Sequence, residues 1–401
     1  MPSELAWLDF SEAENRRARE AVQLFAQRDS RDELGTGVIR DILSDLMFPG
    51  ISVLHQRARY FLFIPWLFIA GARSNSGSKL LEYVAKNERE LIQVLIAGGD
   101  LQGLIGREVG YRLKTLPSTI YWNALQHYGI LRQRASKTDV SRFTATSTKS
   151  KVQEATEAAE DAAGMWSSSI PPVPKGFPRL ASLDFTLSAS EKGWLSDRLL
   201  EGSDGTLLQW LVEQGYEPRG EAYVWDEFKP DSIPESHYRV VRHAKHFAVT
   251  IRGAALLYNY MLAEILESEG KELNEGSTVF RDELADWRDE CDQLNVWSAW
   301  HRPDFWEMCN HLRVVPKSAV EFVEAWVSLA PGLSVNQMIS SKPARELVLY
   351  RERAMKRSRA RLDNAKRLAQ WGGRSGTSLY SYRWTQVSTL LADLAAVTNN
   401  A

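Results

Sequence analysis

Hydrophobic residues recur at helical spacing along most of the chain. In several segments the apolar positions lie three or four residues apart, which places them on one face of a helix. The segments with this spacing are 12–26, 39–47, 80–96, 237–269, 280–294, 319–329 and 344–371. Few segments alternate apolar and polar residues with the period of two that is typical of strands. The pattern therefore predicts a mainly α protein.

The residue composition changes between Ala135 and Pro178. Ser, Thr, Lys, Ala and Glu dominate the first part of this range, and residues 170–178 are rich in proline. A polar and then proline-rich stretch buries little apolar surface and is typical of a connection between domains. We therefore expect a two-part helical protein, with one domain over 1–134, a linker over 135–178 and a second domain over 179–401.

The longest apolar run, Tyr60–Ala72, is too short to cross a membrane. A membrane-spanning helix needs ~20 apolar residues, and Pro65 interrupts this run. We interpret the run as a buried core helix. The first ten residues lack the basic and then apolar layout of a signal peptide. Two cysteines, Cys291 and Cys309, are too few for a disulfide framework and suit a reducing compartment. We therefore expect a cytoplasmic protein. Because the apolar run is too short to span a bilayer, we also expect no membrane contact.

A basic stretch lies near the carboxyl end. The chain carries 49 basic and 51 acidic residues, so binding to nucleic acid would require a local patch. Residues 342–367 hold ten basic and three acidic side chains, a net charge of +7, and on a helix the charged face lies opposite an apolar one. Such a ridge can follow a phosphate backbone. The candidate contacts are Arg353, Lys356, Arg357, Arg359, Lys366 and Arg367, with Arg374 shortly after them. The alternative is internal pairing with the acidic stretch 264–292, whose net charge is −8.

A second candidate DNA contact lies at the end of the first part. Residues 104–110 predict a short helix, and Pro117 followed by Ser118 as the N-cap predicts another that ends at Gly129. This order is typical of a winged helix-turn-helix. In that arrangement the base edges would face Thr119, Asn123 and Gln126. The phosphate contacts would be Arg112, Lys114, Arg132 and Arg134. The alternative is an ordinary helical hairpin.

The acidic residues 282–292 are the candidate for catalysis. Either Asp282, Asp286 and Asp289, or Asp282, Glu283 and Asp286, share a helix face and could bind a metal ion. Two-metal nucleases also need carboxylates from separate elements and a Lys or His nearby, and no such set stands out. Zinc-ligand spacing, phosphate-binding glycine motifs and serine hydrolase motifs are absent from the sequence. We therefore expect no catalytic residue, no metal and no cofactor.

Six short motifs are spread from the first ten residues to the last twenty. They are Trp7-Leu8-Asp9-Phe10, Arg31-Asp32-Glu33-Leu34-Gly35, Phe48-Pro49-Gly50, the run from Arg57 to Trp66, the run from Pro117 to Trp122, and Tyr382-Arg383-Trp384. On these motifs the chain resembles an uncharacterised bacterial family that carries only a domain-of-unknown-function label. Genes of that family tend to lie in mobile defence islands beside helicases and phospholipase-D-like nucleases. The resemblance implies an antiviral accessory protein and supplies no catalytic residues.

Together these features predict a non-enzymatic DNA-binding or complex-assembling component of a bacterial antiviral defence system. Its partners would be DNA and a helicase or nuclease encoded nearby. Two alternatives stay open. One is a metal-dependent nuclease that uses residues 282–292, and the other is a pure protein-interaction subunit for a helicase or nuclease.

Overall fold

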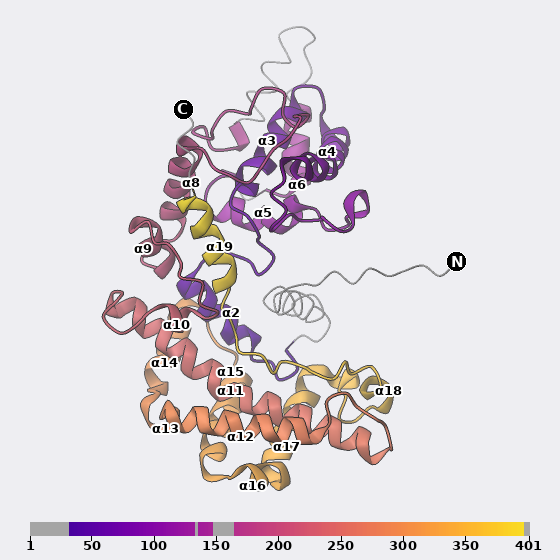
Figure 1. Cartoon of the computed structure of the whole chain (residues 1–401), viewed down its shortest axis with the longest axis vertical. Coiled ribbons are helices and arrows are strands. Elements are labelled where there is room, and N and C mark those ends of the chain that lie inside the picture. The colour runs from indigo at the N-terminus through magenta and orange to yellow at the C-terminus, as the bar shows by residue number, and fades with distance from the viewer. Residues whose placement is uncertain (1–31, 133–134, 147–163, 397–401) are drawn as a thin grey trace. The chain divides into compact units, whose positions relative to one another are not determined.

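The computed structural model describes residues 32–132, 135–146 and 164–396, and these are mainly helical (Figure 1). Within these ranges no β-strand occurs, and the one backbone bridge, between Leu131 and Trp166, is isolated. The prediction of a mainly α fold is confirmed.

The chain forms two compact units, each assembled from two stretches of sequence. Of the described residues, unit 1 contains those from 32 to 42 together with Arg242–Tyr380. Unit 2 contains the described residues between 43 and 241 together with those from 381 to 396. Each unit therefore combines segments that are far apart along the chain.

Two of the three boundaries between the units fall inside helices α2 (Gly37–Met47) and α11 (Glu235–Ser268), and the third falls between Tyr380 and Ser381, outside any helix. They do not coincide with the ranges 1–134 and 179–401 that the composition predicts as domains. Of the expected linker, residues 147–163 lie outside the described part of the chain. A change of composition marks only a local property of the sequence. A compact unit is defined by contacts between segments that are far apart along the chain, so the two kinds of boundary differ.

Unit 1 is built from the second and longer part of α11 and from the helices that follow it. They are α12 (Ser277–Gln293), α13 (Val296–Ala299), α14 (Arg302–Leu312), α15 (Lys317–Leu329), η2 (Ala330–Gly332), α16 (Val335–Ser340), α17 (Lys342–Lys356), η3 (Arg357–Arg359) and α18 (Ala365–Leu368).

Two buried tryptophans connect α12 and α15 to α11. The indole N–H of Trp287 donates to the Val249 carbonyl at 2.7 Å, and that of Trp326 donates to the Thr250 carbonyl at 2.9 Å. Gly253 allows the close approach of Trp287, because a Cβ at that position would lie 2.2 Å from the indole ring. Both side chains thus bury a large apolar surface while their polar N–H groups keep a partner.

Unit 2 contains the helices between α2 and α11 and the last helix. They are α3 (Tyr60–Ala72), α4 (Gly77–Gly98), η1 (Gly110–Arg112), α5 (Pro117–His127), α6 (Lys137–Thr146), α8 (Ala189–Gly202), α9 (Leu207–Glu213), α10 (Val224–Glu227) and α19 (Trp384–Ala395).

Helix α3 is the core helix of unit 2. Eleven of its 13 residues are buried, Pro65 among them. The rings of Phe61 and Tyr60 lie 5.1 Å and 5.4 Å from the Tyr121 ring of α5, measured between centroids. The prediction of a buried core helix is confirmed. In the part of the chain that the structure describes, no helix has both the length and the apolar character that a membrane span requires.

The described end of the expected linker packs against α3. The Trp166 ring is fully buried and lies 5.6 Å from the ring of Phe68. The indole N–H of Trp66 donates to the Pro171 carbonyl at 2.8 Å, and the Phe177 ring lies 5.5 Å from the Trp66 ring. This segment buries aromatic surface, contrary to the expectation from its composition, because its few large rings fill gaps beside α3.

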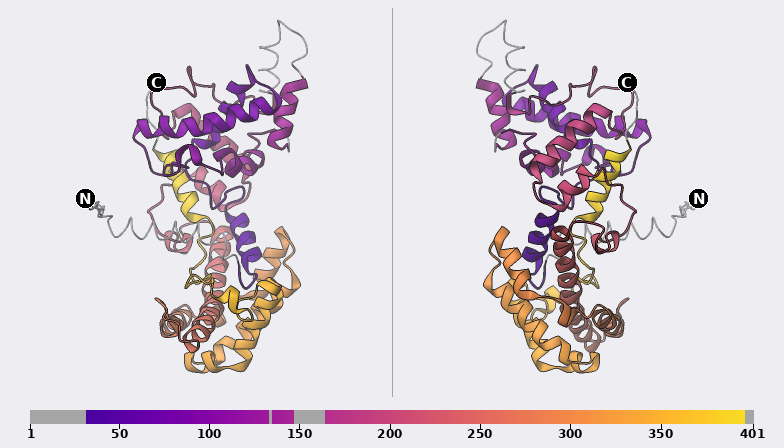
Figure 2. Two further views of the ribbon diagram at one scale, coloured as in Figure 1. Left: turned by 90° about the vertical axis from the view of Figure 1, so that its right-hand side faces the viewer. Right: turned by 90° about the vertical axis from the view of Figure 1, so that its left-hand side faces the viewer.

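The last helix, α19, belongs to the same core (Figure 2). The indole N–H of Trp384 donates to the Glu221 carbonyl at 3.1 Å. The Asp393 carboxylate accepts hydrogen bonds from the Arg57 guanidinium at 2.9 Å and from the Ala58 backbone N–H at 2.7 Å. Helix α19 therefore fixes the backbone just before α3.

Candidate nucleic-acid interface

The region before α5 differs from a helix-turn-helix. Residues 104–109 form turns, and residues 110–112 form the short helix η1. The expectation of an α-helix there is wrong, because Gly106 and Gly110 have φ angles of 87° and 52°, in the left-handed region. In the described ranges there is also no strand that could form a wing.

The N-terminus of α5 is capped by a side chain from α4 rather than by Ser118. The Ser118 backbone N–H donates to Glu88 Oε1 at 2.6 Å, and the Ser118 hydroxyl donates to Glu88 Oε2 at 2.9 Å. Lys137, at the start of α6, donates from Nζ to the Ser118 hydroxyl at 3.0 Å. Burial raises the pKa of Glu88 to about 7. These contacts fix α4, α5 and α6 to one another.

The face of α5 that was expected to contact bases is covered in part by the segment after it. Lys137 Nζ donates to the Thr119 hydroxyl at 2.7 Å. The side-chain amide of Gln126 donates to the Ala135 carbonyl at 2.7 Å. Asn123 alone of the three expected base contacts is exposed without a hydrogen bond to another described residue. The arrangement favours the helical-hairpin alternative for α5.

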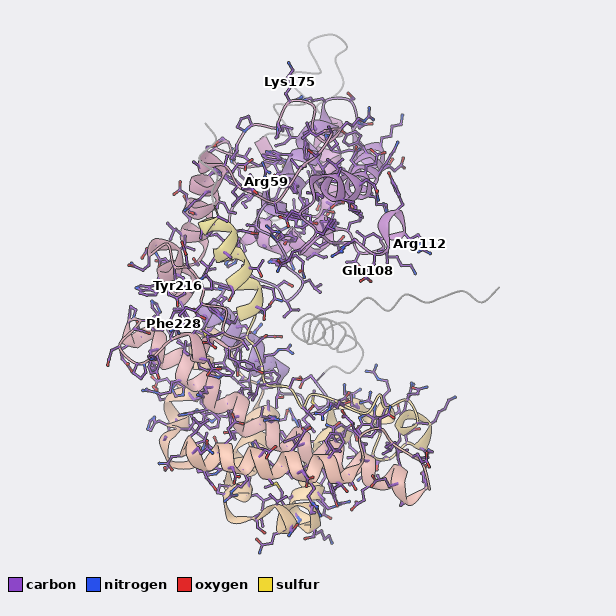
Figure 3. The ribbon with its side chains drawn as sticks, in the orientation of Figure 1. Arg59, Glu108, Arg112, Lys175, Tyr216 and Phe228 are labelled. Atoms are coloured by element: carbon purple, nitrogen blue, oxygen red, sulfur yellow. The ribbon has the colours of Figure 1, made fainter. Side chains whose placement is uncertain are left out.

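The four cations expected beside α5 lie in different settings. Arg132 is exposed and donates to the Ser168 hydroxyl. Arg134 lies outside the described residues. Arg112 and Lys114 are exposed, and their side chains have no ion pair or hydrogen bond to any described residue. Figure 3 shows Arg112 at the edge of unit 2.

The basic stretch near the carboxyl end is not one continuous helix. Helix α17 ends at Lys356, and Arg357 has a φ of 53° and begins η3. The expectation of a helix over 344–371 is therefore wrong in its second half, where only the short α18 is helical. The left-handed backbone at Arg357 turns the chain, so that the cations before and after it do not form one ridge.

Several cations around this break have partners within unit 1. Glu33 forms ion pairs with Lys356 at 3.0 Å and with Arg361 at 2.7 Å. Arg353 forms a bidentate pair with Asp363, which lowers the pKa of that carboxyl. These pairs fold the chain after η3 back onto α17 and onto the first residues of the unit.

Two cations reach the acidic stretch that was considered as an internal partner. Arg345 pairs with Glu264 at 2.5 Å. Arg374 pairs with Glu275 at 2.5 Å and also with Glu283. The acidic stretch therefore neutralises Arg345 and Arg374, and the candidate contact Arg374 is not free to bind phosphate.

Three of the candidate phosphate contacts in the stretch 342–367 have no partner among the described residues. Arg357, Arg359 and Lys366 are exposed, and their side chains make no ion pair or hydrogen bond within the described part of the chain. Arg367 is exposed as well and donates to the side-chain oxygen of Gln370 at 3.1 Å. We call residues 353–367 the basic segment; it carries seven basic side chains and one acidic one.

Buried groups fix the backbone of the basic segment. The Glu352 carboxylate is fully buried and accepts hydrogen bonds from the Tyr258 hydroxyl at 2.7 Å and from the backbone N–H of Arg361 at 2.7 Å. It also accepts from the Leu362 N–H at 3.1 Å. A buried carboxylate with three donors holds the turn in one conformation, so the exposed cations project from a defined backbone.

Two large side chains near the carboxyl end of α17 are exposed. Tyr350 is 57% exposed and Met355 is 41% exposed. The Arg353 guanidinium lies 5.6 Å from the centroid of the Tyr350 ring. The Met355 side chain packs at Gly35, where a Cβ would lie 2.6 Å from the Met355 sulfur, so its remaining surface is what is exposed. Tyr350 lies three residues before Arg353, and residues at this spacing are neighbours on the surface of a helix. This spacing is the sequence feature that could have predicted their contact.

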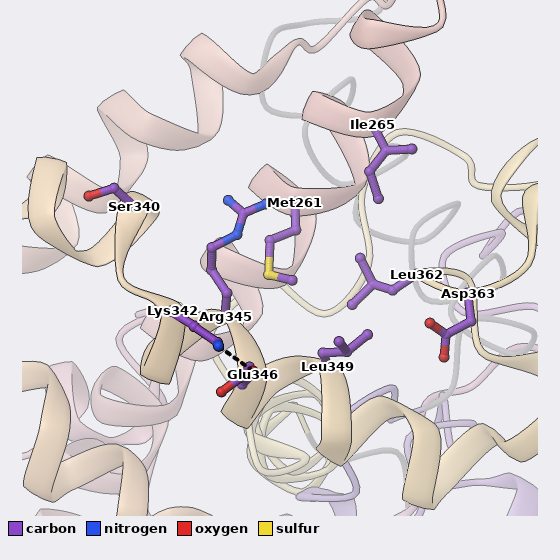
Figure 4. A pocket seen from close by; sticks show the side chains of 9 residues that line it. All are labelled: Met261, Ile265, Ser340, Lys342, Arg345, Glu346, Leu349, Leu362 and Asp363. Carbon is purple, nitrogen blue, oxygen red and sulfur yellow. Dashed lines mark ion pairs between the residues drawn. The ribbon is translucent and has the colours of Figure 1, made fainter.

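A pocket of about 380 Å³ lies beside the basic segment in unit 1 (Figure 4). It is lined by Met261, Ile265, Ser340, Lys342, Arg345, Glu346, Leu349, Leu362 and Asp363. Its walls are mainly apolar, and Lys342 lies 3.9 Å from Glu346. Because the cations at its rim have acidic partners, the pocket does not present a free charge to an anion.

The acidic residues considered for a nuclease do not form a metal site. Among the described residues, no three or more His, Cys, Asp and Glu side chains are grouped so that they could hold a metal ion. Glu283 is occupied by Arg374. Both cysteines are buried, and burial raises the pKa of the Cys309 thiol to about 12 and that of Cys291 as well. The thiols therefore stay protonated at neutral pH, which disfavours metal binding.

The chain belongs to a family of unknown function, DUF6361, whose model matches residues 2–398. No curated protein matches the chain. No solved structure matches it either. The candidate interface therefore rests on the geometry described above.

Proposed function

We propose that this member of the DUF6361 family binds nucleic acid through its basic segment and acts as a non-enzymatic component of a bacterial antiviral defence system. The observation that carries the proposal is that Arg357, Arg359 and Lys366 are exposed, have no partner among the described residues, and lie on a segment whose backbone is fixed. DNA is the nucleic acid that we propose.

The charge of the basic segment supports a polyanion as the ligand. The segment contains seven basic side chains and one acidic side chain, whereas the chain as a whole has a net charge of −2. Each phosphate that such a cation neutralises releases condensed counterions from the nucleic acid, which favours binding. Arginine also matches the phosphate group with two parallel donors.

The role in defence is supported by the family resemblance rather than by the geometry. Short motifs along the chain resemble a family whose genes tend to lie beside helicases and nucleases. In this proposal the partner supplies catalysis, and the protein holds the DNA or assembles the complex. The nuclease alternative loses support, because residues 282–292 present no grouped carboxylates for a metal ion in the described part of the chain.

A salt-titrated binding assay with single-stranded, double-stranded and forked DNA tests the proposal. The test variant replaces Arg357, Arg359 and Lys366 by Glu. We expect its affinity to fall at least tenfold, and the slope of log K against log salt to decrease by about 2 to 3, because three phosphate contacts are lost. The control variant replaces Lys79, Lys175 and Lys229, three exposed lysines of unit 2, by Glu.

The control changes the net charge by the same amount, so a general charge effect would weaken both variants alike. Equal losses in the two variants would contradict a specific role of the basic segment. Absence of binding by the unchanged protein to all three DNA forms at low salt would contradict nucleic-acid binding altogether. That result would favour the protein-interaction alternative.

A further inference from the structure

A loop of unit 2 presents an exposed aromatic ring between cations that have no partner in the described part of the chain. We propose that this loop, residues 104–114, binds an unpaired base on Tyr111, so that the protein prefers single-stranded nucleic acid. The proposal rests on the proposed function and names the class of nucleic acid that the protein recognises.

The loop has a defined backbone. Gly106 and Gly110 have φ angles of 87° and 52°, and the Gly110 N–H donates to the Gly106 carbonyl at 2.8 Å. The Leu113 side chain packs at Gly106, where a Cβ would lie 2.9 Å from it. The two left-handed glycines thus close a tight turn that presents the residues between and after them.

Both ends of the loop are fixed to the core of unit 2. The Ile105 N–H donates to the Tyr60 hydroxyl at 3.0 Å, and Tyr60 is a buried residue of α3. The Arg89 guanidinium of α4 donates to the Leu113 carbonyl at 3.0 Å. Leu104 is itself buried. The backbone that carries the ring and the cations is therefore held in place before a ligand binds, which lowers the entropic cost of binding.

The surface of the loop combines apolar and basic side chains. Tyr111 is 58% exposed and Val109 is 43% exposed. Arg107, Arg112 and Lys114 are exposed, and none of them pairs with a described residue. The acidic side chain among them is Glu108, which Figure 3 shows with Arg112 near the edge of unit 2.

An exposed ring flanked by cations matches single-stranded nucleic acid better than a duplex. Bases stack on aromatic side chains in proteins that bind single strands, while the cations follow the phosphates. In a duplex the faces of the bases are stacked on one another, so that a ring at the protein surface has no partner. One tyrosine and one valine also offer too little apolar surface to anchor a protein to a lipid bilayer.

Fluorescence titrations of the full chain with a single-stranded oligonucleotide and with a duplex of the same length test this proposal. We expect Tyr111→Ala to weaken binding to the single strand about tenfold and binding to the duplex less than twofold, because one stacked base is lost. Tyr111→Phe keeps the ring and should bind as the unchanged protein does. An unchanged melting temperature of both variants shows that the fold is intact.

The outcomes separate this proposal from the one on which it rests. If the unchanged protein binds neither oligonucleotide, nucleic-acid binding itself is wrong. If it binds both, and Tyr111→Ala weakens neither or weakens both equally, the stacking proposal alone is wrong. Binding to phosphatidylglycerol vesicles that is lost in Tyr111→Ala, together with unaltered binding to the single strand, would also overturn it in favour of a membrane contact.

Discussion

Glu88 accepts two hydrogen bonds from Ser118, one from the backbone N–H at 2.6 Å and one from the hydroxyl at 2.9 Å. The N-cap residue of α5, Leu116, has no side chain that could accept a hydrogen bond from the first turn, and the Glu88 carboxyl of α4 accepts it instead. The site is almost fully buried, which raises the pKa of Glu88 from its ordinary value of 4.5 to about 7. We therefore expect the junction of α4 and α5 to respond to pH between the ordinary pKa of Glu88 and about 7.

The first prediction concerns the pH dependence of stability. The folded protein holds the Glu88 proton up to a higher pH than the unfolded chain does. The contribution of Glu88 to stability is therefore full below about pH 4.5 and is lost as the pH rises through about 7. In Glu88→Gln this decline should be absent, so that the free energy of unfolding varies less between these pH values.

Urea unfolding at a series of pH values measures this effect. Glu82→Gln is the matched control, because Glu82 lies on the same helix and is exposed. The control should keep the pH dependence of the unchanged protein. A Glu88→Gln variant with the same pH dependence as the control would show that the Glu88 carboxyl does not titrate in this range.

The second prediction compares two arginines of α17. Arg351 is buried, and its guanidinium donates to the carbonyls of Leu34, Gly35 and Ser318. Lysine cannot reproduce this planar set of donors, so Arg351→Lys should leave buried carbonyls without a partner and cost roughly 2 to 3 kcal/mol. Chemical denaturation measures the loss.

Arg353→Lys is the control for this comparison, because Arg353 is exposed and pairs with Asp363 at the surface. Exposed ion pairs contribute little to stability, so the control should unfold close to the unchanged protein. Equal stability of the two variants would contradict the structural role that we assign to Arg351.

The third prediction concerns the exposed and the covered positions of α5. Replacement of Thr119 and Gln126 by Ala removes the hydrogen bonds to Lys137 and Ala135. We expect a loss of about 1 kcal/mol for each hydrogen bond and a lower melting temperature. The affinity for duplex DNA should not change, because these side chains bind the protein's own chain. Asn123→Ala, at an exposed position, should change neither property.

Thermal melting and DNA titration of the same samples decide between the two interpretations of α5. A double variant that melts normally and loses DNA affinity would restore the recognition-helix interpretation. The predicted result would leave the basic segment and the loop 104–114 as the surfaces that contact nucleic acid.

The candidate site could be predicted from the sequence only in part. The charge of residues 342–367 is visible in the sequence, and Arg357, Arg359 and Lys366 are exposed as expected. The pairing of Glu33 with Lys356 and Arg361 joins residues more than 300 positions apart. Such a pair leaves no local pattern, because each partner alone looks like an ordinary surface charge.

The sequence by itself determined the helical class and the buried position of α3, because both follow from the local spacing and density of apolar side chains. Only the tertiary structure decided where the basic stretch breaks and which of its cations remain unpaired. The turn at Arg357 is fixed by the buried carboxylate of Glu352, which meets Tyr258 from a distant part of the chain. Burial and pairing depend on which distant groups meet in space, and the local pattern of residues does not contain that information.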